Sequence, residues 1–502
     1  MIADMLNNLA IGFAGASTLA NLGYALVGCL LGTLVGVLPG IGVVPTVAML
    51  LPLSFGMEPL SGLIMLAGIY YGAQYGGSTA AILVRMPGEA GSIVTALDGY
   101  EMARKGRAGS ALAIAALASF FAGTVATLLI AAFGPSLASL AMKFHSADYF
   151  SLMVLGLSMT VVLAQGSILK AIAVMLIGFI FGLVGLDINS GVQRFTFGIP
   201  DLWEGVSFLA ISIGLFGLVE VVRNLEFPEP RGDRPKMKIR DLYPNREEFR
   251  ESAPAVVRGT ILGSLLGVLP GGGAVLASFV SYSLEKKLSK RPETFGKGAP
   301  AGVASPEAAN NAGAQTSFVP LLTLGLPSNP IMALLMGAMM IHGIAPGTAI
   351  VSERPDLFWG LIASMWIGNL MLVVLNLPLV GLWVRLLTIS YDLLFPAIMM
   401  FCLIGVYSEG GSAFQILLLA GFTLLGYLLM RCGCEPAPMI IGFILGPMME
   451  ENLRRALTVS GGDYSVFIER PISATLLAAS VLLLLLMALP GLRKSRAEAF
   501  QE

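Results

Sequence analysis

Residues 263–273 read GSLLGVLPGGG, and residues 32–42 read GTLVGVLPGIG. Eight of these eleven positions match without gaps, and the shared Leu-Pro-Gly stands at the same offset in both copies. Proline lacks an N–H, and glycine adopts backbone angles that a helix does not hold, so each copy predicts a helix that breaks and turns. The alternative is a chance likeness between two Gly/Leu-rich stretches, and the shared Leu-Pro-Gly argues against it.

The composition around these two copies is that of a membrane protein. Hydrophobic residues make up 56% of the 502 residues and charged residues only 12%, about half the usual share of charge. The formal net charge of −1 creates no field that would select a nucleic acid as partner. Lipid tolerates only helices or closed barrels, and the apolar runs lack the alternation of a barrel. We therefore predict an all-α polytopic protein in a lipid bilayer, with about 11–13 transmembrane helices.

One charged segment divides the chain. Residues 223–258 hold 16 charged side chains, of which nine are Lys or Arg. The positive-inside rule places such a linker in the cytoplasm. We predict an N-terminal repeat half at 1–222, the linker at 223–258, a C-terminal repeat half at 259–490, and a cytoplasmic tail at 491–502.

The loop charges indicate that the two halves are inverted in the membrane. Glu285–Lys297 contains five Lys or Arg, whereas its counterpart Ser54–Pro59 contains none. The next pair of loops reverses this, because Asp98–Arg107 contains three and Ala338–Gly347 contains none. Equivalent loops with opposite bias are expected for inverted repeats. Parallel repeats are the competing arrangement.

Each Pro/Gly copy predicts a re-entrant hairpin, with tips near 38–42 and 269–273. For the second hairpin we expect two half-helices of about eleven residues, each reaching roughly half the depth of the bilayer. Broken helices expose amides that attract anions and carbonyls that bind a small cation such as sodium. Close helix packing is the alternative reason for these glycines. The predicted tip and ion-binding residues are Pro39, Gly40, Gly42, Pro270, Gly271, Gly272 and Gly273.

Two polar stretches interrupt the apolar runs and predict a substrate site. Residues 70–79 read YYGAQYGGST, and residues 305–316 read SPEAANNAGAQT. We expect the chain to unwind at 76–79 and 310–316. The hydroxyls of the first stretch suit a substrate carboxylate, and the two adjacent amides of the second, with the carboxylate of Glu307, suit a hydroxylated acid or a sodium ion. The alternatives are backbone bonding within a packed helix and a helix cap with a turn. The predicted substrate-binding residues are Gly77, Ser78, Thr79, Asn310, Asn311, Gln315, Thr316 and Ser328.

Motifs for catalysis are absent from the sequence. There is no His-Glu-x-x-His, no Gly-x-Ser-x-Gly and no P-loop Gly-Lys-Ser/Thr. With two His and four Cys in the chain, a metal site has few ligands to draw on. We therefore predict that the protein is not an enzyme and has no cofactor. A channel also uses broken helices, but two hairpins facing opposite sides favour a transporter.

Four stretches together resemble a known family over nearly the whole chain, from about Leu19 to Pro490. They are GTLVGVLPGIG, MLAGIYYGAQYGGSTAAILVRMPGEAGSIVTALDGYEMARKGRAG at 65–109, RFTFGIPDLWEG at 194–205, and PEAANNAGAQTSFVPLLTLGLPSNP at 306–330. Combined, they resemble the large membrane subunit of tripartite tricarboxylate transporters, the TctA family. Two departures stand out. The tips differ (PGIG against PGGG), and LPSN has Ser328 where a glycine is expected soon after the proline.

The resemblance implies a secondary transporter of the bacterial cell inner membrane that imports a tricarboxylate such as citrate, or another organic carboxylate. It implies a small TctB-like membrane subunit and a TctC-like periplasmic solute-binding protein as partners. It also implies symport with an ion, expected to be Na+. An elevator-like motion follows by analogy with other hairpin-bearing carriers, and a rocking bundle is the alternative. A carrier that works without a binding protein and one for an uncharged solute are further alternatives.

Overall fold

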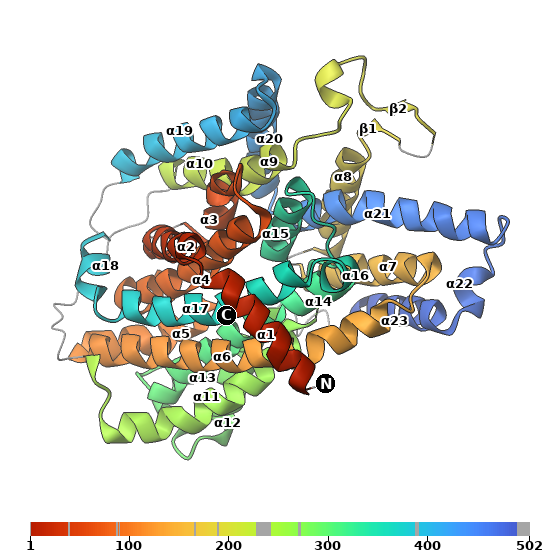
Figure 1. The fold of residues 1–502 in the computed structure, drawn as a ribbon. Coiled ribbons are helices and arrows are strands. Elements are labelled where there is room, and N and C mark those ends of the chain that lie inside the picture. Colours follow the sequence, from red (N-terminus) through yellow and green to blue (C-terminus); the bar gives the residue numbers. More distant parts are fainter. Residues whose placement is uncertain are drawn as a thin grey trace.

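Helices form almost the entire molecule, as the composition predicts. The computed structural model describes residues 2–38, 41–86, 89, 91–164, 167–187, 190–226, 242–269, 273–386 and 391–488. Within these ranges the strands are β1 (Gly185–Leu186) and β2 (Gln193–Arg194), which pair in antiparallel fashion. The prediction of an all-α polytopic fold is therefore confirmed, and Figure 1 shows the arrangement of the helices.

The charged stretch separates α1–α10 from α11–α23. The N-terminal half contains α1 (Ile2–Ala16), α2 (Leu19–Val37), α3 (Val43–Leu50), α4 (Pro59–Val84), α5 (Ser92–Met102), α6 (Ala108–Ala141), α7 (Ser146–Leu163), α8 (Ile168–Gly182), α9 (Phe208–Ser212) and α10 (Val219–Glu226). The C-terminal half contains α11 (Arg246–Gly267), α12 (Gly273–Leu288), α13 (Pro300–Thr316), α14 (Phe318–Leu324), α15 (Pro330–Ile341), α16 (Thr348–Ser352), α17 (Pro355–Asn376), α18 (Val380–Leu386), α19 (Tyr391–Gly410), α20 (Ala413–Arg431), α21 (Ala437–Val459), α22 (Val466–Glu469) and α23 (Pro471–Ala488).

Several of these helices are long and apolar enough to cross a membrane. By length and composition, five candidate spans occur among the described residues: Leu19–Val37, Ser92–Ala141, Phe208–Glu226, Pro355–Asn376 and Ala413–Arg431. Shorter apolar helices accompany them, and the longest of these covers Ser146–Val162. The number of crossings predicted from the sequence remains a prediction.

The two Leu-Pro-Gly copies belong to helices that pack in the same way. Glycines four residues apart on α2 face the backbone of α4, and glycines four residues apart on α11 face the backbone of α13. A Cβ at Gly32 would lie 2.2 Å from the carbonyl oxygen of Ile69, and one at Gly263 would lie 2.2 Å from that of Ala309. The sequence repeat therefore corresponds to a repeated close contact between helices.

The likeness between the two halves extends to the C-terminal ends of α4 and α14. Arg85 caps α4 in the left-handed region with φ 59°, and Gly325 caps α14 there with φ 68°. Each of these residues stands two positions before a proline in the sequence, Pro87 and Pro327 respectively. The left-handed conformation strains a residue that has a Cβ. Gly325 avoids this strain, whereas Arg85, at the matching position of the N-terminal half, does not.

Helices α11 and α12 form a hairpin, but its arms are longer than predicted. The Arg258 Nη2 atom lies 2.9 Å from the Glu285 Oε2 atom, which ties the two arms together well away from the tip. The arms contain 22 and 16 residues because the charged stretch before Arg258 is itself helical. It begins at the Asn245–Glu248 capping box.

The predicted linker is correspondingly shorter. Its ends at 223–226 and 246–258 are helical, as parts of α10 and α11. Residues 227–241 lie outside the described ranges, as does the predicted tail at 491–502.

The helices that follow the two Leu-Pro-Gly copies differ in length. Helix α3 has only eight residues and passes into a short 3-10 turn at Leu51–Ser54, whereas α12 has 16 residues. Gly42 is the N-cap of α3, and Gly273 begins α12, where a Cβ would lie 2.0 Å from the Leu266 carbonyl oxygen. The other predicted tip residues, Pro39, Gly40, Pro270, Gly271 and Gly272, lie outside the described residues.

The prediction that the chain unwinds at 76–79 and 310–316 is wrong, because α4 and α13 run through these stretches as helices. The glycines there serve packing instead. A Cβ at Gly76 would lie 2.6 Å from the Val37 backbone nitrogen of α2, and one at Gly313 would lie 2.8 Å from the Ala274 Cα atom of α12. Close approach of two backbones explains these positions.

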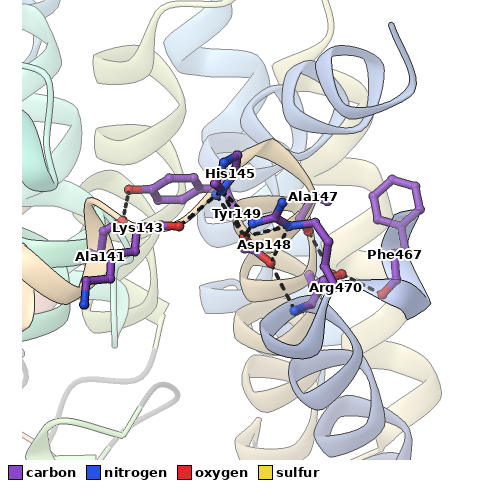
Figure 2. A network of polar contacts seen from close by, with 10 residues as sticks. Ala141, Lys143, His145, Ala147, Asp148, Tyr149, Phe467 and Arg470 are labelled. Carbon is purple, nitrogen blue, oxygen red and sulfur yellow. Dashed lines mark hydrogen bonds and ion pairs between the residues drawn. The ribbon is translucent and has the colours of Figure 1, made fainter. Parts of the chain in front are cut away.

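A second group of helices lies away from the repeated hairpins. In Figure 1, α7, α21 and α23 extend on the right, while α11, α12 and α13 lie at the lower left. Figure 2 shows Arg470, the residue before α23, beside Asp148 of α7, and the Arg470 Nη2 atom lies 2.9 Å from the Asp148 Oδ2 atom. The backbone N–H of Ser473 in α23 donates to Asp148 Oδ1 at 3.1 Å. The Asp148 carboxylate also accepts from the His145 N–H at the start of α7. We call this cluster the Asp148 joint.

Candidate functional site

Two stripes of polar side chains face the interior of the repeated core. Each stripe has the spacing of one helix face, with neighbours three or four residues apart. All eight residues are buried. The stripe on α4 is Tyr71, Gln74, Tyr75 and Ser78, and the stripe on α13 is Glu307, Asn310, Asn311 and Gln315.

Direct hydrogen bonds join the two stripes. The Tyr71 hydroxyl donates to Gln315 Oε1 at 2.8 Å, and the Ser78 hydroxyl donates to Glu307 Oε2 at 3.0 Å. The residue number rises from the first contact to the second on α4 and falls on α13. The two helices therefore pass each other in opposite directions, and the two polar stretches picked out in the sequence meet in space.

Glu307 is the centre of the cluster. The residue is 1% exposed. Its Oε1 atom accepts from the Thr95 hydroxyl of α5 at 2.7 Å, and its Oε2 atom accepts from Ser78 and from Ser119 of α6, the latter at 3.3 Å. Among the described residues no Lys, Arg or His forms an ion pair with it. The carboxylate is thus held by hydroxyl groups donated from three helices.

A second carboxylate lies beside the first. The Asn310 side-chain amide donates to Glu89 Oε1, and Glu89 is near enough to Glu307 to interact with its charge. Two buried side-chain oxygens of the stripes, Asn310 Oδ1 and Gln74 Oε1, have no hydrogen-bond partner among the described residues. The region therefore has more oxygen acceptors than donors.

A small cavity of about 20 Å³, enough for roughly one water molecule, adjoins Glu307. Part of its wall is apolar, from Leu112, Ala115, Ala116, Leu377 and Val380. Its polar wall consists of Tyr75, Ser78, Thr79, Ser119, Glu307 and Asn376. The Asn376 Oδ1 atom is also buried without a partner in the described part of the chain.

The start of α13 is anchored by another buried acid. Asp98 of α5 accepts from the backbone N–H groups of Gly298 and Ala299, both at 2.7 Å, and from the Tyr282 hydroxyl at 2.9 Å. These amides stand at the N-terminus of α13, where a negative charge is favoured. The anchor fixes the position of the helix two turns before Glu307.

Several of the predicted substrate-binding residues lie in or beside this cluster. Ser78 and Thr79 line the cavity, although the Thr79 hydroxyl also donates to the Tyr75 carbonyl at 3.0 Å. Asn311 donates to the Ser119 hydroxyl at 2.7 Å, and through it supports Glu307. Asn310 and Gln315 are engaged by Glu89 and Tyr71.

Other predicted residues have structural contacts. The Thr316 hydroxyl donates to the Ala312 carbonyl at 3.0 Å, and the Ser328 hydroxyl donates to the Ser317 carbonyl at 3.2 Å. Gly77 is a buried position within α4. Arg85, a candidate partner for a substrate carboxylate or Glu89, instead has its guanidinium 5.8 Å from the centre of the Tyr100 ring.

Sequence reasoning missed Thr95, Ser119 and the central role of Glu307. The signal for Glu307 was present, because it stands three and four residues before Asn310 and Asn311 and so shares their helix face. The expectation of an unwound stretch concealed that periodicity. Thr95 and Ser119 lie in apolar helices with no local pattern, so only the tertiary packing brings them to the site.

The oxygen-rich cluster suits a proton or a hard monovalent cation better than a transition metal, which prefers nitrogen and sulfur ligands. Within the part of the chain that the structure describes, no group of three or more His, Cys, Asp or Glu is arranged to hold a metal ion. The cavity offers hydroxyl and amide groups to a ligand.

Known proteins similar to this chain give the family. A family model described as "Tripartite tricarboxylate transporter TctA family" matches residues 22–441. An uncharacterized 52.8 kDa protein in the TAR-I ttuC' 3' region of Agrobacterium vitis is 56% identical over 499 residues, covering 99% of both chains. An uncharacterized protein in the TAR-II ttuC' 3' region of the same organism is 58% identical over 240 residues, covering 48% of this chain and 99% of that one. No solved structure matches the chain significantly. Because the family match extends over most of the chain, the protein belongs to the tripartite tricarboxylate transporter TctA family.

Proposed function

We propose that this protein is the membrane subunit that carries a tricarboxylate or another organic carboxylate into the bacterial cell. The observation that supports this most is that Ser78, Thr79 and Asn376 line one small cavity between α4, α6, α13 and α17. It lies where the two polar stripes meet, and in transporters built from repeats the substrate site lies at the repeat interface. In this proposal the protein binds and moves its substrate and performs no chemistry on it.

The proposal includes alternating access with two inverted halves. The antiparallel passage of α4 and α13 supports inversion, because both helices follow the hairpin in their own half and equivalent helices of inverted repeats run in opposite directions. We favour an elevator-like movement of the hairpin-bearing core against the remaining helices, by analogy with other hairpin carriers. Equal depth of the substrate in inward-facing and outward-facing structures would exclude it.

The proposed assembly has two further proteins and a sodium gradient. A small TctB-like membrane subunit supports the large one, and a TctC-like periplasmic protein delivers the carboxylate. The complex lies in the bacterial inner membrane with the charged linker and the C-terminal tail in the cytoplasm. The second candidate, an autonomous carrier, differs in needing neither partner.

Uptake of labelled citrate and labelled succinate into membrane vesicles tests the proposal. We expect uptake with the two partner proteins and a loss of it without the binding protein. Asn376→Leu should raise the half-saturating carboxylate concentration by about tenfold, because it removes a polar group from the cavity wall. Thr323→Val is the matched control, since its buried hydroxyl bonds only the Val319 carbonyl in its own helix. Absence of uptake of both anions by the complete complex would contradict the proposal, and uptake without the binding protein would favour the autonomous carrier.

A further inference from the structure

Glu307 is a buried acid without a cationic partner in the described structure. Two other acids with little exposed surface are paired with a cation, Glu285 with Arg258 and Asp148 with Arg470, and a third, Asp98, accepts from two backbone N–H groups and the Tyr282 hydroxyl. Glu307 has only hydroxyl donors, and an isolated charge buried at membrane depth is costly. Hydroxyl donors reduce this cost without supplying a compensating charge. Neutralisation of the Glu307 carboxylate by a small cation would remove the cost of the buried charge.

The oxygens around Glu307 provide places for such a cation. The Asn376 Oδ1 atom in the same cavity wall and the Gln74 Oε1 atom in the α4 stripe are buried without partners in the described structure. Asn376 is 6% exposed and Gln74 is 1% exposed. Carbonyl, hydroxyl and carboxylate oxygens are the ligands of hard cations.

The Ser78 hydroxyl can serve either state of the cluster. Its oxygen lies 3.0 Å from Glu307 Oε2 and 3.2 Å from the Gln74 carbonyl oxygen. When Glu307 is ionised, the hydroxyl donates to the carboxylate. When a cation is bound, the hydroxyl proton can turn to the Gln74 carbonyl, which leaves the Ser78 oxygen free to face the cation.

The position of Glu307 links this cation to the substrate. Glu307 and the candidate substrate groups Thr79 and Asn376 line one cavity. An anion entering it would be repelled by an ionised Glu307, and repulsion between like charges is strong where water is excluded. Neutralising Glu307 removes the repulsion, so binding of the cation favours binding of the carboxylate, and the reverse holds by thermodynamic linkage.

The neighbours of Glu307 do not supply another counter-charge. Among the described residues, Glu89 and Tyr75 are the titratable groups near it, and Asp98 and Tyr282 lie nearer the start of α13. Arg258 is occupied by Glu285, and Arg107 forms an ion pair with Glu248. Glu89 is itself an acid, so it supplies no counter-charge to Glu307.

We propose that Glu307 couples the carrier to its driving cation: a proton or a sodium ion neutralises its carboxylate, and the neutralised site admits the carboxylate substrate. The inference rests on the proposed transport of a carboxylate. It places the cation on the α13 stripe rather than at the Pro/Gly tips. Ser78, Thr95 and Ser119 are positioning residues that hold the carboxylate beside the cavity.

The test compares gradient-driven accumulation with counterflow for Glu307→Gln, in vesicles that contain the whole complex. The labelled anion is citrate or succinate, whichever the unmodified protein carries. Gradient-driven accumulation should fall by roughly tenfold or more. Counterflow of labelled against unlabelled anion should fall much less than accumulation does, because glutamine keeps the site neutral. Separate sodium and pH gradients identify the cation.

The outcomes separate the inference from the proposed function. If the unmodified complex carries neither anion, the proposed function fails. If it does carry one, the inference is overturned when Glu307→Gln still accumulates anion with the cation gradient, or when it is present in the membrane but loses counterflow as well.

A second variant tests the inference if Glu307→Gln inserts poorly into the membrane. Thr95→Val keeps the carboxylate and removes a hydroxyl from Oε1. It should raise the half-saturating concentration of the driving cation several-fold, whereas Thr323→Val leaves it unchanged. An unchanged cation dependence in Thr95→Val would then contradict the inference.

Discussion

Asp148 and Glu307 are both buried acids, but the two regions that hold them differ in charge. At the Asp148 joint, the carboxylate is 0% exposed and contacts the Arg470 guanidinium and two backbone N–H groups (Figure 2). In the Glu307 cluster, the contacts of a carboxylate with 1% exposure are hydroxyls from three helices. The first arrangement is complete by itself and fixes α7 to the segment before α23. The second leaves a charge to be balanced, as a site that binds and releases a cation requires.

The largest effect on stability is expected when the Asp148 joint is broken. Arg470→Met leaves the Asp148 carboxylate buried without its cation, and we expect a loss of about 2–4 kcal/mol, since Arg470 is partly exposed. Thermal unfolding of the purified protein in detergent measures it. Arg455→Met is the control, because its pair with Glu451 is exposed on one helix face and should contribute less than about 0.5 kcal/mol. Equal effects of the two variants would show that the joint is not a stabilising centre.

Amide variants of the two acids sharpen the comparison. Asp148→Asn removes a charge that Arg470 and two N–H groups require, and we expect it to cost about 2 kcal/mol. Glu307→Gln removes a charge without a partner and keeps one oxygen acceptor for the hydroxyls, so stability should change by less than about 1 kcal/mol. The same unfolding measurement applies to both. The reverse order of effects would contradict the assignment of charge to these two sites.

A smaller effect is expected at the contact between the stripes. Tyr71→Phe removes the hydroxyl that donates to Gln315 at 2.8 Å, and we expect a loss of about 1 kcal/mol. Tyr407→Phe is the matched control, since Tyr407 is 49% exposed, and its change should lie within about 0.5 kcal/mol. No difference between the two would mean that the stripes do not stabilise each other through this bond.

The sequence allowed the fold class and the location of the polar stretches to be predicted. Each Leu-Pro-Gly copy stands in the sequence between two helices. Ser78 and Asn311, which were predicted to share a site, belong to one cluster of hydrogen bonds, because Ser78 donates to Glu307 and Asn311 donates to Ser119. The predicted unwinding failed because a glycine has two uses in a membrane helix, and only the neighbouring helix decides between a break and a close contact. Gly76 illustrates this, since α2 occupies the space that its side chain would need.

The centre of the site was not predictable from local patterns. Thr95 and Ser119 belong to apolar helices, and their hydroxyls acquire a role only when α5 and α6 pack against α13. Glu307 could have been found from its helical spacing to Asn310 and Asn311. The absence of a counter-charge beside it is a tertiary property, because residues from several helices decide which groups lie within reach.

Infrared difference spectroscopy of the purified complex tests the role of Glu307 most directly. Spectra would be recorded at low and high concentration of the driving cation, for the unmodified protein, Glu307→Gln and Asp148→Asn. We expect a carboxyl band that changes with the cation in the unmodified protein and in Asp148→Asn, and that is missing in Glu307→Gln. A cation-dependent carboxyl band that persists unchanged in Glu307→Gln would show that another acid binds the cation.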